Sequence, residues 1–136
     1  MITRGFDGQD KEEILSGHQI ENVSDGLLAI INGEYKNKQE DGIKGSGYVV
    51  ESLEAALWCF YTTNTFKDAI LRAANLGDDA DTTAAICGQI AGAYYGVNNI
   101  PQNWLENLYK KSQITEMANE LYMIFLREGV KDIHNV

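Results

Sequence analysis

The stretch that most constrains the fold is residues 77–96, where an acidic cluster runs directly into an apolar segment. Asp78, Asp79 and Asp81 stand beside Thr82, and a run rich in alanine and isoleucine follows. Asp and Thr are preferred at helix N-caps because their side-chain oxygens accept hydrogen bonds from the first unpaired backbone N–H groups. The sequence therefore predicts a helix that begins in the acidic cluster.

Glycine recurs at every fourth position of this helix, at Gly88, Gly92 and Gly96. A glycine costs a helix about 1 kcal/mol relative to alanine, so its repetition on one face calls for a reason. We expect a second helix to pass close to Gly88 and Gly92. Gly96 is placed to end the helix, since glycine is favoured just after the last helical residue.

The acidic cluster has two interpretations. The first is capping, in which the carboxylates satisfy the helix start and interact favourably with its dipole. The second is a cation site, because Asp79, Asp81 and Thr82 offer only oxygen ligands. Such ligands suit Mg²⁺, Mn²⁺ or Ca²⁺ rather than zinc. The spacing of these residues does not decide between the two interpretations.

Apolar residues at helical spacing predict further helices over residues 48–62, 65–75 and 114–125, and no stretch of convincing length alternates like a strand. We expect an all-α fold, a compact orthogonal arrangement of about six helices in a single domain over residues 1–136. Nine residues are predicted to feed its core: Val49, Leu53, Leu57, Phe60, Ile70, Ile86, Ile90, Leu105 and Leu121.

Two pairs of reactive residue types lie inside the predicted helices. Glu51 and Glu54 stand three residues apart, which allows a catalytic carboxylate pair, but a solvated helix face is the favoured interpretation. Cys59 and Cys87 both lie in apolar runs, so we expect buried, unreactive thiols.

Composition limits the class of partner. The 136 residues carry a net charge of −9, which argues against nucleic acid because phosphates need Lys and Arg. This charge fits a cation-binding protein, and it also fits simple solubility. No apolar segment resembles a signal peptide or a membrane span. We therefore expect a cytoplasmic protein without a membrane partner.

Several spaced motifs resemble the C-terminal part of the ADP-ribosylglycohydrolase family. They lie in the family's order at residues 45–58, 66–70, 74–82 and 100–105, so that the resemblance covers residues 45–110. The family includes the enzyme that removes ADP-ribose from dinitrogenase reductase. The resemblance implies an all-helical fold and the hydrolysis of a glycosidic bond to ADP-ribose.

The resemblance also implies a metal-dependent site that binds Mg²⁺ or Mn²⁺ through Asp79, Asp81 and Thr82, with Gly47 and Tyr48 contacting an ADP-ribose-type ligand. The family's other metal motif, Thr-Asp-Asp near the N-terminus, has no match in this sequence, and no catalytic residue is identified. We expect a second copy or a complementary N-terminal-half chain to complete the site. The alternative is a catalytically incomplete fragment that acts as a binding or protein-interaction module.

Overall fold

The computed structural model describes residues 8–16 and 23–132. The chain divides into two units, Met1–Ile100 and Pro101–Val136. Within the described ranges it forms seven α-helices and no strand, which confirms the predicted all-α class. A single domain over residues 1–136 stays a prediction.

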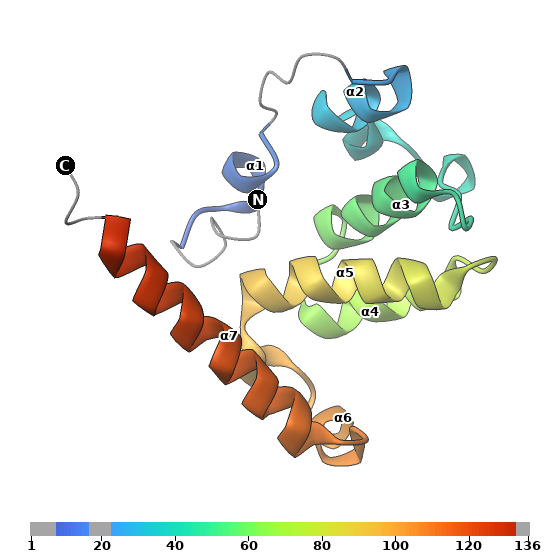
Figure 1. Cartoon of the computed structure of the whole chain (residues 1–136). Helices are drawn as coiled ribbons and strands as arrows, with labels where there is room; N and C mark the ends of the chain where they lie inside the picture. The colour runs from blue at the N-terminus through green and yellow to red at the C-terminus, as the bar shows by residue number, and fades with distance from the viewer. Residues whose placement is uncertain (1–7, 17–22, 133–136) are drawn as a thin grey trace. The chain divides into compact units, whose positions relative to one another are not determined.

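The core of the first unit is built by three helices, α3 (Val49–Tyr61), α4 (Phe66–Asn75) and α5 (Ala80–Tyr95). Helix α5 lies against both of the others (Figure 1). Small side chains let them approach closely, and the alanines and cysteines among them are fully buried: Ala55, Ala56, Cys59, Ala69, Ala73, Cys87 and Ala91. Phe60 fills the remaining space with its ring edge-on to Tyr94, at 5.3 Å between the ring centroids.

The ends of these helices follow local sequence signals. The Thr65 hydroxyl accepts a 3.0 Å hydrogen bond from the Asp68 backbone N–H and so caps α4, at the start of the helix predicted over residues 65–75. Gly96 ends α5 with a φ of 76°, a conformation that glycine adopts without strain. Both cysteines are buried and free, as predicted. Burial raises the pKa of both thiols, Cys59 and Cys87, to about 12, which makes them poor nucleophiles.

The expected close approach at the glycine face is only partly right. Gly88 and Gly92 do face α4, but they meet its side chains and not its backbone. A β-carbon at position 88 would lie 3.6 Å from Ile70 Cδ1, and one at position 92 would lie 3.9 Å from Phe66 Cε2. These are ordinary van der Waals distances, so an alanine fits at both positions.

The predicted core is correct at its centre and wrong at its ends. Leu57, Phe60 and Ile90 are buried. Val49 is 69% exposed and Leu121 is 67% exposed. At the start of α3 it is Val50 that faces α2 (Asp25–Ile31), since its Cγ1 would lie 3.1 Å from a β-carbon at Gly26. Val49 is one residue away on the helix and therefore faces elsewhere. The other four predicted core residues are half-buried: Leu53, Ile70, Ile86 and Leu105.

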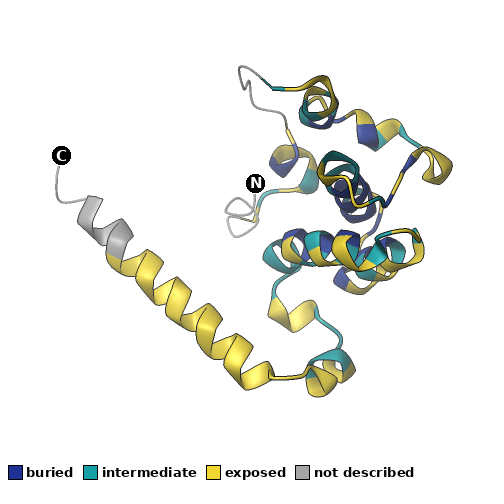
Figure 2. Ribbon diagram, turned by 45° about the vertical axis from the view of Figure 1, so that its right-hand side comes forward, coloured by how far each residue is buried: buried dark blue, intermediate teal, exposed yellow. Residues whose placement is uncertain are grey.

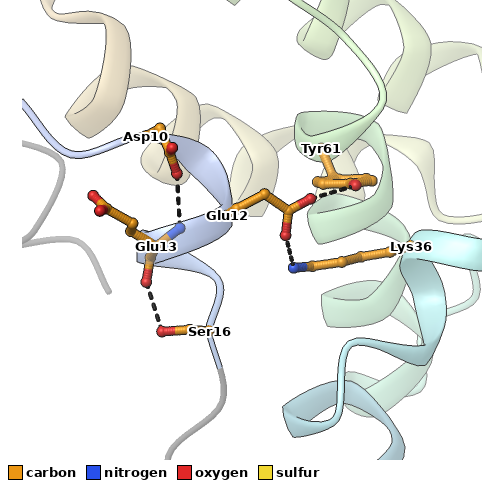
Figure 3. A network of polar contacts seen from close by, with 6 residues as sticks. All are labelled: Asp10, Glu12, Glu13, Ser16, Lys36 and Tyr61. Carbon is orange, nitrogen blue, oxygen red and sulfur yellow. Dashed lines mark hydrogen bonds and ion pairs between the residues drawn. The ribbon is translucent and has the colours of Figure 1, made fainter.

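The N-terminal helix α1 (Lys11–Ile14) is fastened to the end of α3 by polar contacts. Lys11 Nζ donates hydrogen bonds to the carbonyl groups of Phe60 and Thr63 and lies 4.3 Å from the centre of the Phe60 ring. Glu12 accepts hydrogen bonds from Tyr61 and Lys36 (Figure 3). Residues 34–47, between α2 and α3, contain two 3₁₀ turns, η2 (Glu34–Asn37) and η3 (Glu40–Gly42).

The second unit contains α6 (Gln102–Asn107) and α7 (Lys111–Asp132), and the 3₁₀ turn η4 (Val97–Asn99) precedes it in the chain. Pro101 directly precedes α6 as its N-cap. No residue of this unit whose exposure is described is buried. Figure 2 shows α7 exposed throughout its coloured length, which explains why the predicted burial of Leu121 is wrong.

Candidate functional site

The predicted metal residues lie at a sharp turn between α4 and α5. Gly77 and Asp78 both adopt left-handed backbone conformations, with φ of 82° and 50°. Glycine does so freely, and aspartate is one of the few other residues that tolerate it. Asp79 then forms the N-cap of α5, with Asp81 and Thr82 in the first turn. The helix therefore begins in the acidic cluster, as the sequence predicts.

A second segment, the glycine loop formed by residues 45–47, lies against this turn. The Asp79 backbone N–H donates a 2.8 Å hydrogen bond to the Gly45 carbonyl group. A β-carbon at Gly47 would lie 3.4 Å from Asp79 Oδ2, and one at Gly45 would lie 3.2 Å from the Gly77 carbonyl oxygen. The fold thus brings Gly47, predicted to contact substrate, beside Asp79, predicted to bind metal.

Tyr48 follows this loop as the N-cap of α3 and is 61% exposed. Its backbone N–H donates to Ser46 Oγ at 3.2 Å, which fixes the loop and leaves the phenol ring in solvent. Its role in ligand contact stays a prediction, as do the roles of the other predicted site residues.

The two aspartates interact directly. A hydrogen bond from the Asp79 carboxyl group, together with backbone N–H groups of Thr82 and Asp81, holds the pKa of Asp81 below its ordinary value. Neighbouring carboxylates repel each other, and a cation bound between them would relieve that repulsion. Among the described residues, neither of the two ion pairs involves Asp79 or Asp81.

Capping does not account for Asp79. Although it occupies the N-cap position of α5, its side chain makes no capping hydrogen bond. By contrast, Asp10 and Thr65 both cap their helices through side-chain oxygens. The Asp79 carboxyl group instead borders the space beside Gly47, where a β-carbon would lie 3.4 Å from its Oδ2.

The donor set fits part of an oxygen-rich cation site. Asp79, Asp81 and Thr82 supply carboxylate and hydroxyl oxygens, which are the ligands that Mg²⁺ and Mn²⁺ prefer. Across residues 8–16 and 23–132, no group of three or more His, Cys, Asp or Glu side chains gathers to hold a metal. The described chain therefore offers an incomplete ligand set.

Thr83 is a residue of this region that sequence reasoning missed. Its hydroxyl is fully buried and is the one buried side-chain polar atom in the described chain without a hydrogen-bond partner. It lies 3.5 Å from the position of a β-carbon at Gly45. Thr83 shares a helical face with the buried Cys87 and Ile90, and this spacing is the signal that separates it from the exposed Thr82.

Glu51 and Glu54 do not form the solvated face that the sequence favours, because both are half-buried and held by other side chains. The Ser46 hydroxyl donates a hydrogen bond to Glu51, which ties this half-buried carboxylate to the glycine loop. Glu54 forms an ion pair with Lys38 at 2.7 Å, and its side chain is 14% exposed. Each glutamate is thus held by a different partner.

Comparison with known proteins decides the family. The family model of the ADP-ribosylglycohydrolases matches residues 1–130. The chain belongs to the ADP-ribosylglycohydrolase family. It is 48% identical over 117 residues to "ADP-ribosylarginine hydrolase Tri1" of Serratia proteamaculans (strain 568), a match over 86% of this chain and 32% of the relative.

Two further relatives agree with this assignment. The chain is 43% identical over 68 residues to "ADP-ribosyl-[dinitrogen reductase] glycohydrolase" of Rhodospirillum rubrum, a match over 50% of this chain and 23% of the relative. A solved structure, "ADP-ribosylglycohydrolase-related protein complex", superposes with a TM-score of 0.78 at 34% identity, covering 90% of this chain and 43% of that one. The chain thus spans about a third or less of the length of these curated relatives.

None of the helices in the described ranges has the length and apolar character needed to cross a membrane.

Proposed function

We propose that this chain contributes part of a metal-dependent site that hydrolyses the glycosidic bond between ADP-ribose and an arginine side chain. The observation that carries the proposal is the contact between the glycine loop and the acidic turn. A β-carbon added at Gly47 would lie 3.4 Å from Asp79 Oδ2. The choice of arginine follows the name of the Serratia relative.

In this proposal Asp79, Asp81 and Thr82 hold Mg²⁺ or Mn²⁺. A bound cation of this kind orients ligand oxygens and lowers the pKa of a water molecule. The absence of a side chain at Gly47 leaves room for a ligand beside Asp79. The exposed ring of Tyr48, at the edge of the same loop, supplies an apolar surface for that ligand.

A second polypeptide completes the site. The described residues gather no group of three or more potential metal ligands, and half of a site leaves the cation short of protein oxygens. The complementary part of the family fold, or a second copy of this chain, would supply the rest. The proposal retains the cytoplasmic location expected from the sequence.

The incomplete ligand set also supports a second candidate function, that of a binding or protein-interaction module without catalysis. In that case the cation stabilises the acidic turn or does not bind. The enzyme would hydrolyse the glycosidic bond, whereas the module would not. Metal binding is tested first, and hydrolysis second.

Thermal unfolding with and without Mn²⁺ or Mg²⁺ tests the metal residues. With water completing the coordination we expect weak binding, with a Kd of about 1 mM. At about ten times this Kd, the free energy of unfolding of the wild type should rise by about 1.4 kcal/mol. Asp79→Asn and Asp81→Asn should each abolish this gain. Asp41→Asn, at an exposed position of η3, is the matched control and should retain it.

Absence of a metal-dependent shift in the wild type would refute the metal site. Hydrolysis is then measured as release of ADP-ribose from an ADP-ribosylarginine protein, with the chain alone and with the complementary part of a relative. Release that requires both polypeptides and Asp79 supports the enzyme. Metal binding without release by the mixture supports the module.

A further inference from the structure

Helix α7 carries an apolar stripe on one face. Positions i, i+3, i+7, i+10 and i+11 of this helix fall on the same side. Five large apolar side chains occupy these positions, and their exposed fractions run from 49% to 67%. We call them the α7 stripe: Ile114, Met117, Leu121, Ile124 and Phe125. Aligned exposed side chains of this kind are typical of an association surface.

The α7 stripe belongs to the family's fold rather than to an appended tail. The family model extends to residue 130 and so includes the whole stripe. The chain nevertheless spans only 32% of the Serratia relative and 43% of the solved neighbour. Most of the fold that accompanies this helix in the relatives therefore lies outside this sequence.

The described residues of the first unit, 8–16 and 23–100, do not offer a matching surface. Its exposed large apolar residues come singly or in twos from separate elements: Leu28 of α2, Tyr48 and Val49 at the start of α3, Leu71 of α4 and Val97 of η4. A second α7 helix would limit the interface to five stripe residues on each side, whereas a stable interface takes about 20–30. The complementary part of the fold would in addition contact the acidic turn, whose site it is proposed to complete.

We propose that the α7 stripe docks onto the complementary helical part of the ADP-ribosylglycohydrolase fold, the part that this sequence does not contain. The partner is an α-helical polypeptide with an apolar groove that receives one helix face. The inference rests on the proposed function for the choice of this partner. It assigns the contact to a surface that includes none of the site residues.

The test uses the full chain and the segment of the Serratia hydrolase that the match leaves uncovered, produced together with a tag on the segment. We expect the wild-type chain to keep the segment soluble and to co-purify with it in a one-to-one complex by sedimentation. Leu121→Glu combined with Phe125→Glu places two charges in the apolar contact. This variant should weaken binding by more than about tenfold, the size of a hot-spot effect.

The matched control is Asn119→Glu combined with Met123→Glu. It adds the same two charges at the same spacing on the same helix, but on the face opposite the α7 stripe. We expect it to bind like the wild type. Circular dichroism of both double variants checks that the helix content is unchanged, so that any loss of binding reports on the stripe.

Failure of the wild type to co-purify with the segment would overturn the inference. An equal loss of binding in the two double variants would also overturn it. A wild-type dimer that only the stripe variant abolishes would show that a second copy is the occupant. Slow hydrogen exchange over residues 111–127 in a monomer would show that the chain covers its own stripe. Co-purification without hydrolysis rejects the proposed enzyme alone, whereas metal binding without co-purification rejects this inference alone.

Discussion

Helices α3 and α7 both carry apolar residues at helical spacing, yet their surroundings differ completely. Helix α3 buries seven residues, among them Trp58 and Phe60. Along residues 111–127, α7 buries none. The cover of α3 is supplied by α4 and α5 within the same unit. The comparison teaches that helical spacing identifies the face of a helix that needs a partner, but not which polypeptide supplies it.

The strongest test of this comparison removes one phenylalanine from each helix. Phe60→Ala should cost about 3–5 kcal/mol of unfolding free energy, because it leaves a cavity in a close-packed core. Phe125→Ala in the chain on its own should stay within about 0.5 kcal/mol, because its side chain is already in water. Urea denaturation of both variants measures the difference.

An equal cost for the two changes would break the comparison, since Phe125 would then have a cover in the isolated chain. Because a loss of this size can unfold a small domain, Phe60→Leu serves as a milder core variant. It should still be more destabilising than Phe125→Leu, which keeps an exposed apolar side chain.

Within the first unit, the packing of the glycine loop against the acidic turn should be tighter than the packing of α4 against the glycine face of α5. Gly45→Ala would place a β-carbon 3.2 Å from the backbone oxygen of Gly77, which has little freedom to move. We expect a cost of about 1–3 kcal/mol from overpacking. Gly88→Ala is the matched control, because its β-carbon would meet only a side chain at 3.6 Å.

For Gly88→Ala we expect a gain of up to about 1 kcal/mol, because alanine favours the helix. Melting temperatures of Gly45→Ala, Gly88→Ala and the wild type show which change destabilises the fold more. Tolerance of Gly45→Ala would show that the glycine loop yields easily, and would weaken the case for a pre-formed site beside Asp79. Destabilisation by Gly88→Ala would show a closer approach of α4 than the structure has.

A third test uses the pH dependence of stability, with half-buried Lys11 as the residue tested and exposed Lys111 of α7 as the control. Burial lowers the pKa of Lys11 from 10.5 to about 8. Between these values the folded chain has lost the proton while the unfolded chain still holds it. The contribution of Lys11 to the unfolding free energy should therefore rise as the pH increases from 8 toward 10.5.

The measurement is the difference in unfolding free energy between the wild type and Lys11→Met at pH 7 and at pH 9.5. Both proteins contain the same buried cysteines and tyrosines, so the difference isolates Lys11. Lys111→Met, at an exposed position of α7, should leave the pH dependence of the wild type unchanged. A difference that stays constant with pH would indicate that Lys11 holds α1 without losing its proton.

Much of the fold could be predicted because helix ends are set by neighbours in sequence. The helix start at Thr65 and the helix end at Gly96 involve residues within one helical turn, and both are confirmed. The burial of Val49 and Leu121 is wrong because it depends on elements far away along the chain. Periodicity placed both residues on the apolar face of a helix, but it did not indicate whether another element would bury that face.

The candidate site divides in the same way. The sequence by itself determined that Asp79, Asp81 and Thr82 stand at the start of a helix, because acidic and hydroxyl residues followed directly by an apolar run mark a helix start within a few residues. Only the tertiary structure brought Gly45 and Gly47 against that turn, turned the Asp79 carboxyl group away from capping, and buried the Thr83 hydroxyl. Those outcomes depend on how α3, α4 and α5 pack, and packing joins residues more than thirty positions apart in the chain.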